Sequence, residues 1–118
     1  DQVESLNNKN IRAIALTSQL SQEEIIIAFD NLQFGGFKFL YLSPEKLQSK
    51  FIQDKIKQLN VSFIAIDEAH CISQWGHDFR PSYKNIPLFI ESLNVRPVIG
   101  AFTATATKLV VEEIKELL

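Results

Sequence analysis

Two adjacent carboxylates, Asp67 and Glu68, follow a short apolar run and come just before His70. Successive strand residues point in opposite directions, so the two acids meet different surroundings and can do different work. In nucleotide hydrolysis, one such group holds a metal ion while another orients or deprotonates the attacking water. The alternative is a pair of exposed acids that begin a loop. The residue types therefore indicate either phosphoryl-transfer chemistry or a plain loop start.

An aromatic and polar segment continues directly from His70. It carries amide, imidazole, guanidinium and ring side chains at Gln74, Trp75, His77, Phe79, Arg80 and Tyr83. The three rings stand four residues apart, a spacing that would place them on one face of a helix. Rings and guanidinium planes bind unstacked bases, so the segment predicts a stacking platform for single-stranded nucleic acid. The alternative is a hydrophobic cluster that pins a loop.

His70 has more than one interpretation. It is either a hydrogen-bonded structural residue or a link to the hydroxyl groups of Thr103 and Thr105, which follow a later strand. These threonines could also cap the last helix. A zinc site with Cys71 and His77 is a poor match, because the spacing fits no usual ligand pattern and a fourth ligand is missing.

Ser43 and Pro44 precede Glu45 at the expected start of a helix. A serine cap with proline at the first helical position explains these residues fully. A helix N-terminus also attracts anions, so a nucleic-acid phosphate could bind there. Both interpretations stay open.

The elements that position these residues are predicted to alternate as βα units of an α/β fold. Strands are expected at residues 11–16, 37–42, 61–66 and 98–102, and helices at 19–32, 51–59, 83–93 and 109–118. Ser21 and Glu24 have the spacing of a capping box, and Pro87 is expected to interrupt or delay its helix. The run 61–66 is short, continuous and rich in β-branched and aromatic residues, which favours a strand buried on both faces of a parallel sheet. The acid pair is then expected at the carboxyl end of that strand, where ligands of such sheets bind.

Five segments resemble the motifs of one enzyme family. Asp67-Glu68-Ala69-His70 resembles helicase motif II, the Walker B element of superfamily 2, and residues 71–83 resemble the aromatic-rich loop of RecQ-family DNA helicases. Residues 101–107, 41–47 and 1–6 resemble motif III, motif Ib and part of motif Ia. Ser82 stands where these loops commonly carry an acid, which puts in doubt any charge pair that the acid would make.

This resemblance implies an ATP-dependent DNA helicase that moves 3′ to 5′ in DNA repair and recombination. Asp67 would hold Mg²⁺ through water, Glu68 would activate the hydrolytic water, and His70, Thr103 and Thr105 would transmit the state of the nucleotide. Single-stranded DNA would be met by Gln74, Trp75, His77, Phe79 and Arg80, with Ser43 and Pro44 as further contacts. The implied partners are ATP, single-stranded and duplex DNA and a second RecA-like domain. The implied compartment is intracellular, either the bacterial cytoplasm and nucleoid or the eukaryotic nucleus.

The 118 residues contain no Gly-x-x-x-x-Gly-Lys-Ser/Thr phosphate loop. We therefore expect residues 1–118 to be part of the first motor domain, an incomplete RecA-like (P-loop NTPase) domain with a parallel sheet flanked by helices. We also expect no ATPase activity from these residues alone. The alternatives are an RNA-directed DEAH-type helicase, or a non-catalytic nucleic-acid or protein-binding module that keeps a relic motor fold.

Composition limits the function only weakly. The net charge is −2, so the chain lacks the basic excess of a typical DNA-binding domain. The single Cys71 excludes an internal disulfide. No apolar run approaches the length of a membrane-spanning helix, so we expect no membrane partner.

Overall fold

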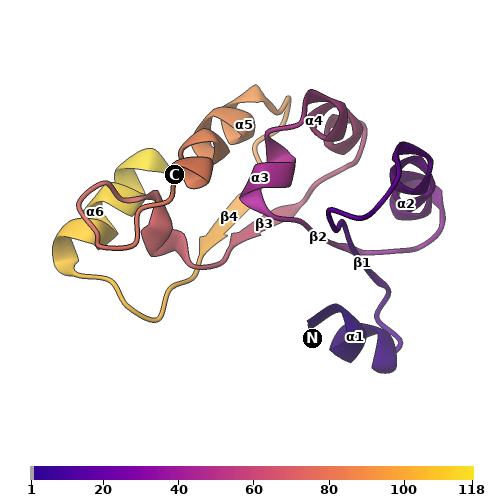
Figure 1. Cartoon of the computed structure of the whole chain (residues 1–118), viewed down its shortest axis with the longest axis horizontal. Helices are drawn as coiled ribbons and strands as arrows, with labels where there is room; N and C mark the ends of the chain where they lie inside the picture. Colours follow the sequence, from indigo (N-terminus) through magenta and orange to yellow (C-terminus); the bar gives the residue numbers. More distant parts are fainter. Residues whose placement is uncertain (1) are drawn as a thin grey trace. The chain divides into compact units, whose positions relative to one another are not determined.

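The computed structural model describes residues 2–118, which form an α/β fold with parallel strands (Figure 1). Asp1, which begins the segment resembling motif Ia, lies outside the described residues. The backbone divides into two compact units, the first ending at Leu59 and the second beginning at Asn60. None of the described helices is long and apolar enough to cross a membrane.

The first unit contains two parallel strands and four helices. In chain order these are α1 (Gln2–Asn8), β1 (Ala13–Ala15), α2 (Gln22–Phe34), β2 (Phe39–Tyr41), α3 (Pro44–Leu47) and α4 (Lys50–Lys57). β1 and β2 pair in register, with Ile14 opposite Leu40. The predicted capping box is confirmed: the Glu24 N–H donates to Ser21 Oγ at 3.1 Å, and the Ser21 N–H donates to Glu24 Oε1 at 3.0 Å. The helix α1 has no counterpart among the predicted helices.

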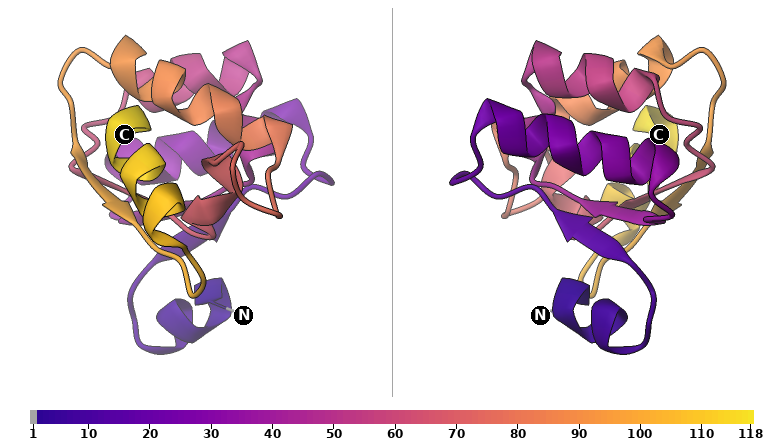
Figure 2. Two further views of the ribbon diagram at one scale, coloured as in Figure 1. Left: turned by 90° about the vertical axis from the view of Figure 1, so that its left-hand side faces the viewer. Right: turned by 90° about the vertical axis from the view of Figure 1, so that its right-hand side faces the viewer.

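The second unit carries the acid pair and the aromatic segment. Its elements are β3 (Phe63–Ile66), the 3-10 helices η1 (Ala69–Ile72) and η2 (Pro81–Asn85), α5 (Ile86–Ser92), β4 (Val98–Ala101) and α6 (Lys108–Leu117). β3 and β4 are parallel neighbours, with Ile64 opposite Ile99. Pro87 lies in the first turn of α5, so the predicted late start of this helix is confirmed. Figure 2 shows α5 and α6 on one side of the β3–β4 pair.

One detail of the predicted sheet is wrong. Within each unit the described strands form one parallel pair, β1–β2 in the first unit and β3–β4 in the second. β3 is not buried on both faces: Ile66 is 5% exposed, whereas Phe63 on the opposite face is 52% exposed. The physical reason is that α5 and α6 cover one face of this pair. The α/β class with parallel strands is confirmed.

Candidate functional site

The acid pair lies at the carboxyl end of β3, where the chain turns sharply. Glu68 makes this turn in the left-handed region, with φ 52° and ψ 42°. The Glu68 N–H donates to Asp67 Oδ1 at 2.9 Å, and the Ala69 N–H donates to the Phe102 carbonyl at 2.9 Å. Both carboxylates are exposed. The sharp turn therefore holds two accessible acids on a backbone that is tied to the end of β4.

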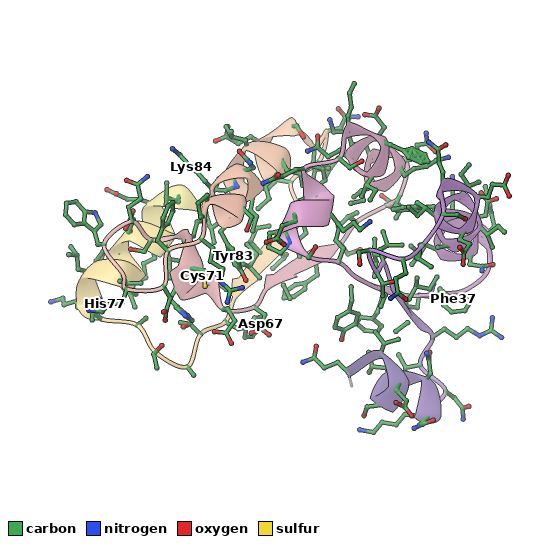
Figure 3. All side chains as sticks on the ribbon, viewed as in Figure 1. Phe37, Asp67, Cys71, His77, Tyr83 and Lys84 are labelled. Carbon is green, nitrogen blue, oxygen red and sulfur yellow. The ribbon has the colours of Figure 1, made fainter. Side chains whose placement is uncertain are left out.

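Tyr83 is hydrogen-bonded to the backbone of this turn. Its phenol donates a hydrogen bond to the Asp67 carbonyl at 3.1 Å, while its ring is buried. Burial raises the pKa of Tyr83, and the neighbouring Cys71 raises it further. Figure 3 shows Asp67, Cys71 and Tyr83 close together, with His77 at the outer end of the loop. The third ring of the aromatic segment is therefore part of the core and not of a surface platform.

His70 connects three segments of the second unit. Its Nδ1 lies 2.6 Å from Thr103 Oγ1, beyond the end of β4. Its Nε2 lies 3.5 Å from Glu68 Oε2 and 3.4 Å from Asp78 Oδ2, and the side chain is only 12% exposed. The turn after β3, the segment after β4 and the aromatic segment therefore all contact one imidazole ring. The predicted contact with Thr103 is confirmed.

The surroundings of His70 restrict its hydrogen bonds. Nε2 faces the carboxylates of Glu68 and Asp78, which only accept hydrogen bonds. The Thr103 hydroxyl has one proton to donate, and it lies near both Nδ1 and the Thr105 carbonyl, which is 3.1 Å away. Donation to one acceptor excludes donation to the other. The Thr103 hydroxyl therefore lies between the imidazole of His70 and the backbone of the turn at residues 103–105.

Neither Thr103 nor Thr105 caps the last helix, so the capping alternative is wrong. Thr107 is the N-cap of α6, and its Oγ1 accepts the Val110 N–H at 3.3 Å. The Thr105 N–H instead donates to Thr103 Oγ1 at 3.3 Å. The physical reason is position, because a cap must immediately precede the first helical residue, which is Lys108.

The aromatic segment is not helical between η1 and η2, so the three rings do not share one face. Trp75 is 72% exposed, Phe79 is half-buried and Tyr83 is buried. The polar side chains Gln74, His77 and Arg80 are exposed. The segment therefore presents one free ring and a set of polar groups, while its far end is held by a 2.9 Å bond from the Arg80 N–H to the Cys71 carbonyl.

Ser43 and Pro44 lie in the first unit. The Ser43 hydroxyl accepts the Lys46 N–H at 3.2 Å, so the predicted cap is confirmed. An open hollow of about 570 Å³ lies beside this cap and is lined in part by Lys46 and Ser49. A phosphate contact there stays a prediction.

The Asp67 carboxylate is a ligand of the kind that Mg²⁺ prefers. The carboxylate is exposed and uses one of its roughly four lone pairs for the Glu68 N–H. Mg²⁺ commonly keeps several waters and takes one or two carboxylates plus substrate phosphates, so this single acid fits such an ion. Among residues 2–118 there is no cluster of three or more His, Cys, Asp or Glu side chains that could hold a metal.

The sequence profile of DEAD/DEAH box helicases matches residues 1–114. The chain belongs to the DEAD/DEAH box helicase family. Its α/β fold is accordingly a fragment of a RecA-like fold, and residues 67–70 are the motif that gives the family its name.

Individual relatives of this DEAD/DEAH box chain are RecQ-type helicases. The ATP-dependent DNA helicase RecQ of Bacillus subtilis is 46% identical over 97% of the chain, and the probable ATP-dependent DNA helicase RecS of the same organism is 44% identical over all of it. The ATP-dependent DNA helicase Q-like 2 of Arabidopsis thaliana is 41% identical over the whole chain. The chain spans 19%, 23% and 18% of these three relatives. The resemblance to RecQ-family helicases is thereby confirmed.

Two residues that contact the predicted site had not been predicted. Asp78 faces His70, and Glu113 on α6 accepts hydrogen bonds from the start of the aromatic segment. Asp78 could have been noticed as an acid within the loop. Glu113 gives no local signal, because it reads as an ordinary acid of an amphipathic helix.

Proposed function

We propose that the chain is part of an ATP-dependent DNA helicase of the RecQ type, which moves 3′ to 5′ and unwinds duplex DNA in repair and recombination. The observation that carries the proposal is the set of contacts around His70. This ring contacts Thr103 on one nitrogen, and Glu68 and Asp78 on the other. Events at the nucleotide and events at the aromatic segment would therefore reach the same side chain. The names of the relatives support the same function.

In this proposal the acid pair acts on ATP. Asp67 would hold Mg²⁺, which when bound would neutralise charge on the phosphates. The Glu68 side chain is 60% exposed, so its carboxylate is accessible to water and can accept a proton from the attacking water molecule. His70, Thr103 and Thr105 transmit the state of the nucleotide.

The aromatic segment acts on DNA in the same proposal. The exposed ring of Trp75 stacks on an unpaired base, a contact of about 1–3 kcal/mol. Gln74, His77, Phe79 and Arg80 complete the contact with single-stranded DNA, and Ser43 with Pro44 meets a backbone phosphate. A second RecA-like domain supplies the remaining contacts with the nucleotide. The protein works inside the cell, either in the bacterial cytoplasm and nucleoid or in the eukaryotic nucleus.

The test is ATP hydrolysis by the full protein with and without single-stranded DNA, beside its Glu68→Gln and Trp75→Ala variants. Glu68→Gln should lower turnover about 10²- to 10⁴-fold, because the general base is lost. Trp75→Ala should lose the stimulation by DNA. Leu88→Ala is the control, because it removes an exposed apolar side chain, 64% exposed, from α5 in the same unit.

Each other outcome points to an alternative function. Hydrolysis stimulated by RNA and not by DNA would indicate an RNA-directed helicase. A full protein that binds nucleic acid but never hydrolyses ATP would indicate a binding module with a relic motor fold.

A further inference from the structure

Glu113, on the helix α6, makes two hydrogen bonds with the start of the aromatic segment. Its Oε2 accepts a 2.5 Å bond from the Ser73 hydroxyl, and its Oε1 accepts a 3.4 Å bond from the Gln74 N–H. Ser73 is fully buried, at 0% exposed. The Ser73 oxygen in turn accepts the Trp75 N–H at 3.1 Å. One carboxylate therefore organises the backbone of three consecutive residues.

These bonds hold the backbone and leave the side chains free. Gln74 is exposed, and Trp75 is 72% exposed. The indole is thus presented to solvent from a fixed peptide, and fixing the peptide lowers the entropy that a base must remove when it stacks. A carboxylate that served only its own helix would pair with a residue three or four positions away. Glu113 instead bonds to residues that lie far from it in the sequence.

The other end of α6 is joined to the residues that contact His70. Thr107 caps this helix, and Thr103, which lies 2.6 Å from the imidazole, precedes it in the same short segment. The aromatic segment is thus connected to His70 by two routes. One runs through Asp78, and the other runs through Glu113 and α6.

We propose that Glu113 is a positioning residue that latches the start of the aromatic segment to α6, so that DNA arriving at Trp75 is signalled to Thr103 through this helix. The latch itself rests on the geometry of residues 73–75 and 113. The signalling part rests on the proposed helicase function.

The latch is tested by hydrogen–deuterium exchange of the Gln74 and Trp75 amides in the full protein. In Glu113→Ala both amides should exchange at least about tenfold faster, because their protection depends on this carboxylate. Glu112→Ala is the matched control: it removes the neighbouring, exposed acid of the same helix. Equal exchange in the two variants would overturn the latch.

Two further variants separate loss of the latch from a general loss of stability. Ser73→Ala removes the acceptor of the Trp75 N–H but not the acceptor of the Gln74 N–H, so only Trp75 should exchange faster. Glu113→Gln keeps one carbonyl oxygen for the Ser73 hydroxyl, and its amide nitrogen cannot accept from Gln74. In that variant only Gln74 should exchange faster. Uniformly faster exchange across the second unit in both variants would overturn the proposal.

The signalling part is tested by ATP hydrolysis against the concentration of single-stranded DNA. Glu113→Ala should raise the concentration of single-stranded DNA needed for half-maximal stimulation about fivefold. Glu112→Ala should behave as wild type. The signalling part would be overturned if the Gln74 and Trp75 amides exchange faster in Glu113→Ala while DNA stimulates hydrolysis as in the wild type. A wild-type protein that DNA never stimulates would contradict the proposed function, while the exchange pattern still decides the latch.

Discussion

Glu68, one of the two predicted catalytic acids, has an unfavourable backbone conformation. Its left-handed conformation, with φ 52°, costs a non-glycine residue about 1 kcal/mol or more. The conformation lets the chain leave β3 and enter η1 within one residue, while Ala69 bonds to Phe102. The backbone conformation that places the Glu68 carboxylate at this turn therefore lowers the free energy of unfolding.

Glu68→Gly should be more stable than Glu68→Ala by about 1 kcal/mol, because glycine adopts this conformation without a steric penalty. Urea unfolding of the two variants measures the difference. Neither variant keeps the carboxylate, so the comparison isolates the backbone. A more stable alanine variant would show that the turn is not strained.

Cys71 and Tyr83 make the stability of the folded chain depend on pH in the alkaline range. Burial is the main cause that raises the pKa of both groups, above ordinary values of 9.0 and 10.0. The folded state therefore holds these protons more tightly than the unfolded state. This contribution to stability is fully present below pH 9 and is lost as the pH rises through the higher pKa of the folded state.

Stability should accordingly fall above about pH 9, by at most about 1.4 kcal/mol per pH unit for each group. Urea unfolding between about pH 7 and pH 11 measures the slope. Cys71→Ala should show a shallower fall than the wild type, because it lacks one of the two groups. Parallel curves would contradict a raised thiol pKa.

Among the elements, α6 offers a direct test of which threonine caps it. Thr107→Ala should destabilise the chain by about 1 kcal/mol, because it removes the acceptor of the Val110 N–H. Thr105→Ala should cost less than about 0.5 kcal/mol, since its side chain is exposed and it contributes through its backbone. Thermal or urea unfolding of the two variants decides the matter, and a larger loss in Thr105→Ala would reverse the assignment.

The predicted elements succeeded where the determining interactions are local. The Ser21–Glu24 box and the late start of α5 at Pro87 depend on residues within one turn, and both were predicted. The short 3-10 helix η1 was not predicted, because its ends are held by bonds to distant residues. One of these is the hydrogen bond from the Ala69 N–H to the Phe102 carbonyl, which no pattern of residues near Ala69 predicts.

At the scale of the whole chain, the absence of a phosphate loop from residues 1–118 determines what these residues can do by themselves. Residues 1–118 alone should hydrolyse no ATP above the uncatalysed background, with or without single-stranded DNA. The reason is that no glycine-rich loop with its lysine holds the phosphates. Release of phosphate measures this. Turnover by the 118 residues, stimulated by DNA, would refute it.

The sequence by itself determined the family, the order of the motifs, the parallel α/β class and the location of the acid pair after β3. These follow from local spacing and from the alternation of apolar runs. Only the tertiary structure decided that Tyr83 is buried while Trp75 is exposed, and that His70 meets both Thr103 and Asp78. It also decided that Glu113 holds the aromatic segment. Such contacts join residues far apart in the chain, so their geometry depends on how β3, β4 and α6 pack, which no local pattern of residue types encodes.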